Sequence, residues 1–297
     1  MKILVSGSHG LVGKALIASL KRDGVEVVNL VRQRSASASE IEWHPNLGKV
    51  DAQQLEGFDV VVHLAGESIA SGRWTEEKKQ KIRDSRVKGT ELLSLALAQL
   101  SRPPATFICA SAIGYYGNRG DELLTEESAP GGDFLAAVCV AWEKATGAAE
   151  AKGIRTVHTR FGIILDDQGG ALQRMLTPFK MGVGGKVGDG KQWMSWISLE
   201  DVVSGLKFLL NYSAINGAVN FTAPEPVTNS DFTQALGDHL SRPTVFSMPA
   251  FAARLAFGEM ADALLLSGAK VVPKRLSEAG FEFKQRDLKC ALEDILS

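Results

Sequence analysis

The chain has 297 residues, of which 45 % are hydrophobic, and a formal net charge of −1 at pH 7. A chain of this length and composition buries a large core, either as one large domain or as two smaller domains packed together. The near-zero net charge gives no reason to expect nucleic acid or an anionic membrane as a partner.

Strand-like and helix-like segments alternate through the first two-thirds of the chain. Apolar runs predict strands at residues 3–5, 25–31, 59–64, 106–110 and 156–161. Apolar residues at helical spacing predict helices at residues 11–20, 75–100 and 134–151. This alternation is typical of right-handed βαβ units, so the predicted fold class is α/β with a doubly wound parallel sheet.

The pattern loosens from about residue 166 onward. The glycine-rich residues 182–190 predict a loop, followed by a strand near 193–197 and helices at 200–210, 230–240 and 249–266. We therefore divide the chain into a first domain, residues 1–165, and a smaller C-terminal α/β lobe, residues 166–297. We expect this lobe to rest on the carboxyl edge of the sheet and to be partly interleaved with it.

Cysteine usage and hydropathy bear on the compartment. Cys109, Cys139 and Cys290 are dispersed along the chain and lack metal-ligand spacing, which favours a reducing environment and predicts no metal site. The apolar run at the N-terminus is too short for a signal peptide, and no later run has the length of a membrane span. The sequence therefore predicts a cytosolic protein without a membrane partner.

The most informative motif is a glycine trio directly after the first predicted strand. Gly7 permits a tight turn, Gly10 lets the backbone approach a pyrophosphate, and Gly13 lets the following helix pack close to the strand. The free N–H groups at the start of that helix, around Leu11 and Val12, face the phosphates. The alternative is a glycine-rich turn that binds nothing. Because the strand, the turn and the helix occur in the required order, we predict a dinucleotide-binding site.

The end of the second predicted strand indicates which dinucleotide. Proteins that prefer NAD usually carry an acidic residue there, which bonds the ribose hydroxyls. This chain carries Arg32 and Arg34 instead, with no acidic residue between positions 31 and 34. A guanidinium group suits a 2′-phosphate, which a carboxylate would repel, so we predict NADP(H), with Arg32 as the stronger candidate. The alternative is that both arginines are ordinary solvated surface charges.

These motifs, together with others along the chain, resemble the extended short-chain dehydrogenase/reductase superfamily, and within it the "epimerase family" proteins that have their own C-terminal domain. The resemblance is carried by blocks at residues 7–13, 59–69, 73–75, 85–87, 110–117, 141–143, 196–197, 273–276 and 280–281. It implies a Rossmann fold, NADP(H) binding, and a C-terminal substrate lobe. It also implies cofactor contacts from Leu64, Ala65, Gly66 and Ser111. A homodimer follows from the same resemblance and the paired long helices.

The chain departs from that superfamily at its catalytic positions. The superfamily uses a Tyr-x-x-x-Lys pair on one helical face, where the lysine ammonium lowers the pKa of the tyrosine phenol. At this spacing the chain has Cys139 and Glu143, and the usual hydroxyl position falls on Ala112, beside Ser111. Both parts of the usual apparatus are thus altered.

Four residues remain as catalytic candidates. Glu143 is a candidate general acid or base; the alternative is a salt bridge, for example with an arginine between residues 73 and 86. Ser111, Tyr115 and Tyr116 are candidate proton donors, and the alternative for the two tyrosines is packing. Cys139 beside a carboxylate is a poor thiolate, so we expect a small buried residue there.

Several other polar residues have two interpretations. Arg73 is expected to lie near Gly66, above the edge of the sheet, where it could contact a ligand. Most of the charged residues in the helix that follows are expected to be solvated. Arg160 at the end of a predicted strand either orients the substrate or fixes a loop. His63 and His9 are expected to be a structural strand-end residue and a turn residue.

Two classes of function follow. The first is an NADP(H)-dependent oxidoreductase or epimerase-like enzyme that acts on a small polar substrate, with sugar-like molecules among the candidates. The second is a sensor or regulatory module that binds NADP(H) without turnover, and the altered positions Cys139 and Glu143 keep it open.

Overall fold

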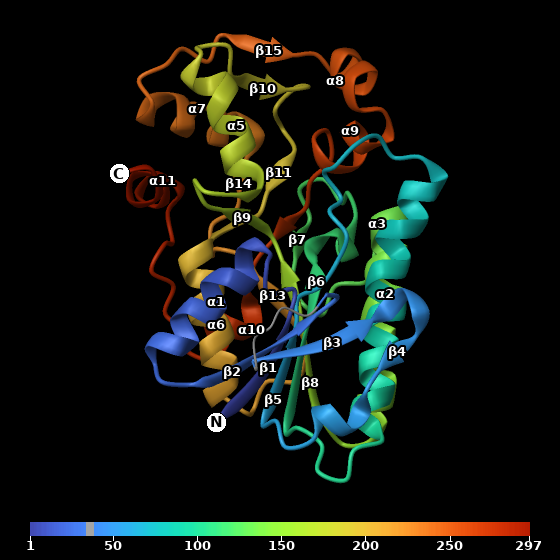
Figure 1. Cartoon of the computed structure of the whole chain (residues 1–297). Helices are drawn as coiled ribbons and strands as arrows, with labels where there is room; N and C mark the ends of the chain where they lie inside the picture. Colours follow the sequence, from blue (N-terminus) through green and yellow to red (C-terminus); the bar gives the residue numbers. More distant parts are fainter. Residues whose placement is uncertain (34–38) are drawn as a thin grey trace.

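The computed structural model describes residues 1–33 and 39–297, so the candidate Arg34 lies outside the described residues. Within them, eight strands form one central sheet in the order β13-β8-β6-β5-β1-β2-β3-β4, parallel except for the β3–β4 pair (Figure 1). In chain order these strands are β1 Lys2–Ser6, β2 Glu26–Val31, β3 Glu40–His44, β4 Lys49–Val50, β5 Val60–His63, β6 Thr106–Ala112, β8 Arg155–Phe161 and β13 Gly217–Phe221.

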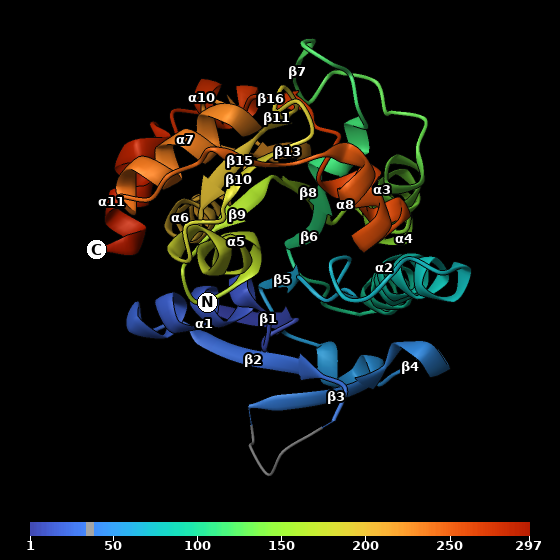
Figure 2. The same ribbon diagram turned by 90° about the horizontal axis from the view of Figure 1, so that it is seen from above.

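Helices cover both faces of this sheet, as seen from above in Figure 2. Two helices, α1 and α6, pack on one face and bury Leu16 and Leu206; α2, α3 and α4 pack on the other face and bury Leu97 and Trp142. Their bounds are α1 Leu11–Arg22, α2 Glu76–Ala98, α3 Phe134–Lys144, α4 Gly147–Ala151 and α6 Leu199–Asn211. The predicted doubly wound α/β fold is therefore confirmed.

The sequence explains why the central strand lies where it does. In β1, Ile3, Leu4 and Val5 are fully buried, as expected of a parallel strand covered on both faces. The strand pairs with β2 on one side and β5 on the other. Its carboxyl end therefore points into the edge where the neighbouring parallel strands also end, and this edge carries the candidate site.

The C-terminal part has its own small core beyond the carboxyl edge of the sheet. Apolar side chains of α5, α7 and α11 meet there, including Leu176, Phe232 and Leu292. The remaining elements are β7 Leu123–Leu124, β9 Ile163–Leu165, α5 Gly170–Lys180, β10 Gly185–Val187, β11 Trp193–Met194, β12 Trp196–Ser198, β14 Val227–Thr228, α7 Asn229–His239, β15 Phe246–Met248, α8 Ala250–Phe257, α9 Glu259–Leu264, β16 Lys270–Val271, α10 Lys274–Glu278 and α11 Leu288–Leu296.

Three strands of the central sheet, β3, β4 and β13, were not expected from the sequence. Strand β3 pairs with β2, and β13 pairs with β8 at the opposite edge. Because α6 and β13 come from beyond residue 165 and lie in the central layer, they are the interleaved part of the C-terminal segment. The division of the chain at residue 165 stays a prediction.

Several predicted elements are wrong in detail. The helix predicted at 134–151 is two helices, because the hydroxyl of Thr146 between them donates to the Glu143 carbonyl and competes with the helical pattern. The helix predicted at 249–266 is divided into α8 and α9 at Gly258, whose φ is 63°. The loop predicted at 182–190 contains β10, which pairs with β15, and the strand near 193–197 is two strands, β11 and β12.

The longest helix is α2, and it is strongly charged along its first half. Among the helices that the structure describes, none combines the length and apolarity needed to cross a membrane.

Candidate functional site

The glycine trio forms a tight turn between β1 and α1. Gly7 has a φ of 72°, and its carbonyl accepts a hydrogen bond from the Gly10 amide at 2.9 Å. A Cβ at Gly13 would lie 2.3 Å from the Gly7 carbonyl oxygen, so the helix approaches the turn too closely for any side chain there. This is the geometry that the motif predicts for a phosphate-binding turn.

The space beside Gly10 fits a dinucleotide pyrophosphate. Gly10 is the exposed N-cap residue of α1 and makes no side-chain cap hydrogen bond. A Cβ at this position would meet the Gly7 carbonyl oxygen at 3.3 Å and would otherwise occupy the space in front of the helix N-terminus. The N–H groups of the first helical residues, including Leu11, Val12 and Gly13, point toward this end of the helix. The residues present therefore fit the cofactor that the sequence predicts.

The end of β5 borders the same turn. A Cβ at Gly7 would lie 2.7 Å from the Leu64 backbone and 2.8 Å from the Ala65 amide. Gly66 follows, and a Cβ there would lie 3.5 Å from the Arg86 guanidinium. Leu64, Ala65 and Gly66 thus line the edge of the cradle, where the resemblance puts cofactor contacts.

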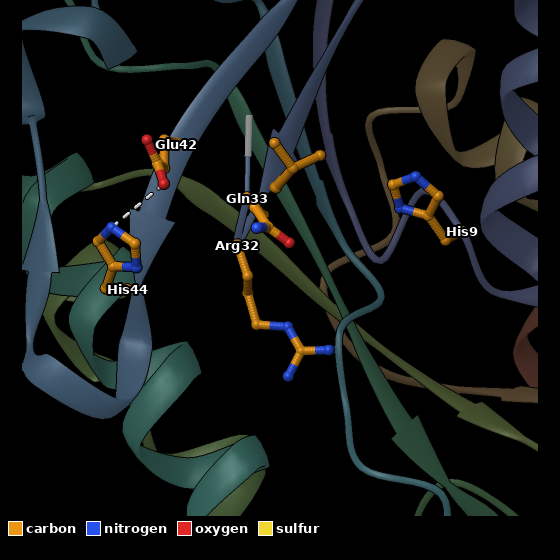
Figure 3. Close-up of a pocket in the computed structure, with 6 residues that line it drawn as sticks. His9, Arg32, Gln33, Glu42 and His44 are labelled. Carbon is orange, nitrogen blue, oxygen red and sulfur yellow. Dashed lines mark ion pairs between the residues drawn. The ribbon is translucent and has the colours of Figure 1, made fainter. Parts of the chain in front are cut away.

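Arg32 lies just beyond β2, exposed, in an open pocket of about 700 Å³. Figure 3 shows this pocket between two walls, with Glu42 and His44 of β3 on one side and His9 of the glycine-rich turn on the other. The exposed position of Arg32 beside the phosphate cradle suits the predicted contact with a 2′-phosphate.

The altered catalytic positions form one hydrogen-bonded cluster. Arg160 of β8 makes a bidentate ion pair with Glu143 of α3, with Nε–Oε1 and NH2–Oε2 distances of 2.8 Å. Ser111 at the end of β6 donates its hydroxyl to Glu143 Oε1 at 2.7 Å. Burial disfavours the charge on Arg160, but the Glu143 carboxylate prevails and holds the pKa of the guanidinium above its usual value. The salt bridge considered as the alternative for Glu143 is therefore present, but its partner is Arg160 and not an arginine between residues 73 and 86.

Both candidate tyrosines contact the same arginine. The Tyr116 hydroxyl accepts a bond from Arg160 at 2.9 Å and donates to Asn220 Oδ1 at 2.6 Å, and its side chain is fully buried. Burial raises the pKa of Tyr116 to about 12. The Tyr115 ring lies under the Arg160 guanidinium, whose central carbon is 3.4 Å from the ring centroid. Asn220 was not predicted, because nothing in its local sequence marks β13 as a neighbour of β8.

Cys139 lies on α3 at the position where the superfamily has tyrosine. Its side chain is buried, and burial raises the pKa of the thiol to about 12, with the Glu143 carboxylate adding to the effect. A thiol held neutral in this way is neither a nucleophile nor a proton donor at neutral pH. This agrees with the expectation of a small buried residue.

Arg73 contacts the C-terminal part of the chain rather than the cradle. Its guanidinium donates to the Leu255 carbonyl of α8. Arg174 of α5, which the sequence analysis did not single out, donates to the Ala70 carbonyl at 2.6 Å. Residues 66–75 are therefore held from two sides of the C-terminal part, close to the turn at the end of β5.

The fold and this edge of the sheet define a dinucleotide-binding α/β protein, and comparison with known proteins gives its family. Residues 3–221 match the NAD dependent epimerase/dehydratase family, and residues 248–295 match a domain of unknown function, DUF1731. The chain belongs to the NAD-dependent epimerase/dehydratase family.

Relatives of similar length are named epimerase family proteins. Mb2239 from Mycobacterium bovis is 44 % identical over 290 residues, which cover 98 % of this chain and 96 % of the relative. YfhF from Bacillus subtilis is 36 % identical, and the aligned region covers 100 % of this chain and 98 % of YfhF. The resemblance to epimerase family proteins that the sequence predicts is confirmed.

Solved structures agree with the fold. Human epimerase family protein SDR39U1, solved with NADPH, superposes with a TM-score of 0.91 at 31 % identity and 99 % coverage of both chains. A nucleoside-diphosphate sugar epimerase from Corynebacterium glutamicum superposes with a TM-score of 0.83 at 36 % identity, covering 100 % of this chain and 58 % of the other. The prediction of NADP(H) agrees with the cofactor in the human relative.

Proposed function

We propose that this protein is an NADP(H)-dependent oxidoreductase that acts on a small polar substrate, with sugar-like molecules among the candidates. The observation that carries the proposal is the Ser111 hydroxyl, held by Glu143 at the carboxyl end of β6. This strand lies beside β5, which lies beside β1 and its phosphate-binding turn. In folds of this class a dinucleotide lies across the carboxyl ends of the parallel strands, which is the edge where the Ser111 hydroxyl lies.

The Ser111–Glu143 pair supports proton transfer. When bound, the nicotinamide accepts or supplies a hydride at the substrate carbon. In the oxidation direction, Ser111 Oγ accepts the proton of a substrate hydroxyl and passes its own proton to Glu143 Oε1, 2.7 Å away. In the reduction direction the same two protons move the other way, so the pair replaces the tyrosine of related enzymes without a phenol.

The rest of the cluster keeps this pair in place. Arg160 binds both oxygens of Glu143, and this bidentate contact fixes the orientation of the carboxylate relative to Ser111. The Tyr116 hydroxyl accepts a hydrogen bond from the third guanidinium nitrogen, and Asn220 in turn accepts from that hydroxyl. We therefore assign proton transfer to Ser111 and Glu143, and positioning to Arg160 and Tyr116. Tyr115, half-buried under the guanidinium, is a wall of the site in this proposal.

A label-transfer screen tests whether the protein turns over. The purified protein is incubated with NADPH carrying deuterium at C4 and with a panel of small aldehydes, ketones and keto-sugars, and products are analysed by mass spectrometry. We expect deuterium in the product of at least one compound class, lost in Ser111→Ala and kept in Ser101→Ala, a serine exposed beyond the opposite edge of the sheet.

The alternative class makes a different prediction. A sensor without turnover would bind NADPH tightly and transfer no deuterium to any compound of the panel. Transfer that persists at the unmodified rate in Ser111→Ala would contradict the assignment of Ser111 while leaving the oxidoreductase class intact.

The cytosolic location and the homodimer are also proposals. Cys109, Cys139 and Cys290 are free thiols, which suits a reducing compartment. The helices α2 and α3 pack side by side, and a pocket of about 320 Å³ between Arg83 and Phe134 lies on their surface. Light scattering of the purified protein tests the dimer, and fractionation of the source cells tests the location.

A further inference from the structure

We infer that Glu42 and His44 of β3 set the preference between NADPH and NADH, with His44 binding the 2′-phosphate beside Arg32 and Glu42 opposing it. The inference rests on the proposed cofactor. It adds two residues of β3, which lie outside both the glycine motif and the end of β2. It starts from the alternation of side chains along β3.

The two residues occupy one face of β3. Ile41 and Trp43 are buried and pack toward α2, where Trp43 would meet a Cβ at Gly89 at 3.6 Å. Side chains alternate across a strand, so Glu42 and His44 face the opposite side, and both are exposed. Parallel pairing with β2 puts Glu42 in register with Val31, directly before Arg32. Glu42 and His44 line the same pocket as Arg32, so this face of β3 is a wall of that pocket.

The pocket continues from the phosphate cradle. Its far wall is His9, the residue before Gly10, and Arg32 and Gln33 lie between His9 and β3 (Figure 3). Val31 also lines the pocket. A dinucleotide with its pyrophosphate at Gly10 has one ribose directly adjacent. The ribose 2′ position therefore falls in the space that Arg32, Glu42 and His44 share.

The charges in this pocket have opposite effects on a 2′-phosphate. Arg32 attracts it, and an uncompensated carboxylate at Glu42 would repel it. His44 Nε2 lies 3.4 Å from Glu42 Oε1, so the imidazole and the carboxylate are in contact. The two nitrogens of the imidazole ring point in different directions, so one faces Glu42 while the other is available to the phosphate. With NADH the phosphate is absent, and Glu42 can accept a bond from the 2′-hydroxyl.

This arrangement predicts opposite effects of two substitutions. His44→Gln removes the imidazole contact to the phosphate and should weaken NADPH binding about tenfold while NADH binding changes little. Glu42→Gln keeps a polar partner for His44 but removes the repulsive charge, so NADPH binding should tighten, and NADH binding should weaken. The ratio of the NADPH and NADH dissociation constants therefore changes in opposite directions in the two variants.

The test is titration calorimetry of NADPH and NADH with the full chain, at one fixed ionic strength. His239→Gln, on α7 of the C-terminal part, is the matched control and should leave both constants unchanged. Titration with 2′-phospho-AMP and AMP separates the 2′ position from the nicotinamide end, and the same ratio changes are expected.

The outcomes separate this inference from the proposed function. Failure of the unmodified protein to prefer NADPH would contradict the proposed cofactor. The inference alone would be overturned if the unmodified protein prefers NADPH but His44→Gln and Glu42→Gln have the same ratio of dissociation constants as His239→Gln. Loss of affinity for both cofactors to the same extent in either variant would also overturn it, because a merely structural role predicts that result.

Discussion

Arg160 and Glu143 form a bidentate ion pair across β8 and α3, and their side chains are only 4 % and 12 % exposed. The pair stands where the superfamily that this chain resembles keeps its lysine, so the charge at this helical position is reversed. Instead of an ammonium that lowers the pKa of a neighbouring phenol, the chain has a carboxylate that accepts the Ser111 hydroxyl. In the mechanism we propose, the proton therefore moves through Ser111 and Glu143 rather than through a phenol.

The first prediction concerns Glu143. Glu143→Gln retains the size of the side chain but removes the proton acceptor, so turnover per folded molecule should fall by roughly 10²–10⁴-fold. The same change leaves Arg160 with an incomplete partner and should lower the free energy of unfolding by about 3 kcal/mol. Label-transfer rates, normalised to the folded fraction measured by denaturant unfolding, check both effects.

Arg155→Met provides the control for this variant. Arg155 begins the same strand, and its guanidinium donates to the carbonyls of Leu209, Tyr212 and Ile215, away from the candidate site. It should lower stability and leave turnover per folded molecule unchanged. If Glu143→Gln behaves in the same way as Arg155→Met, Glu143 is structural and takes no part in proton transfer.

The second prediction concerns the phosphate turn. In Gly10→Val the side chain would occupy the space before the α1 N-terminus, so NADPH affinity should fall at least tenfold while the melting temperature stays within about 2 °C. Gly147→Val at the start of α4, where a Cβ meets nothing within 4 Å, is the matched control. Unchanged NADPH affinity in Gly10→Val would mean that the pyrophosphate binds elsewhere.

A third variant tests how closely α1 approaches the same turn. In Gly13→Ala the added Cβ would lie 2.3 Å from the Gly7 carbonyl oxygen. The turn itself must shift, so both stability and NADPH affinity should fall, as measured by thermal unfolding and calorimetry. A Gly13→Ala protein with unchanged stability would contradict the close approach of α1 to β1.

The fourth prediction concerns pH and His63. Burial lowers the pKa of His63 from 6.5 to about 4, and the Ser6 hydroxyl lies 2.6 Å from its Nδ1. Between these pH values the unfolded chain binds a proton at His63 that the folded chain does not, so stability rises with pH across this window. Lowering the pH from 6.5 to 4 should cost about 3 kcal/mol of unfolding free energy at this residue.

Urea unfolding at a series of pH values measures this effect. His63→Phe, which packs an aromatic ring between Trp43 and Phe107, should show a shallower loss of stability over the same range. Parallel curves for the unmodified protein and the variant would show that His63 is not held neutral by burial.

The parts of the site that sequence predicts are those that local sequence determines. The order strand, Gly7-to-Gly13 turn and helix lies within a short stretch, so the cradle follows from its spacing, and Arg32 follows from its place after the next strand. Glu143, Ser111 and Arg160 are each identifiable from position alone. Their mutual contact is not, because it depends on β6 and β8 pairing over the helix between them.

Other features depend on pairing between distant segments. β3 is short, its residues alternate as in many exposed segments, and only its pairing with β2 puts Glu42 and His44 beside Arg32. β10 pairs with β15 some sixty residues later, which no local pattern in the glycine-rich stretch indicates. These elements form because tertiary contacts override weak local preference.

Binding of NADPH and NADH, measured side by side by calorimetry for the unmodified protein and for Arg32→Asp, tests the central claim most directly. The account predicts that the unmodified protein binds NADPH at least about tenfold more tightly, since one charge-assisted contact is worth roughly 1.5–3 kcal/mol, and that Arg32→Asp inverts or abolishes this preference. Equal dissociation constants for the two cofactors in the unmodified protein would contradict the account.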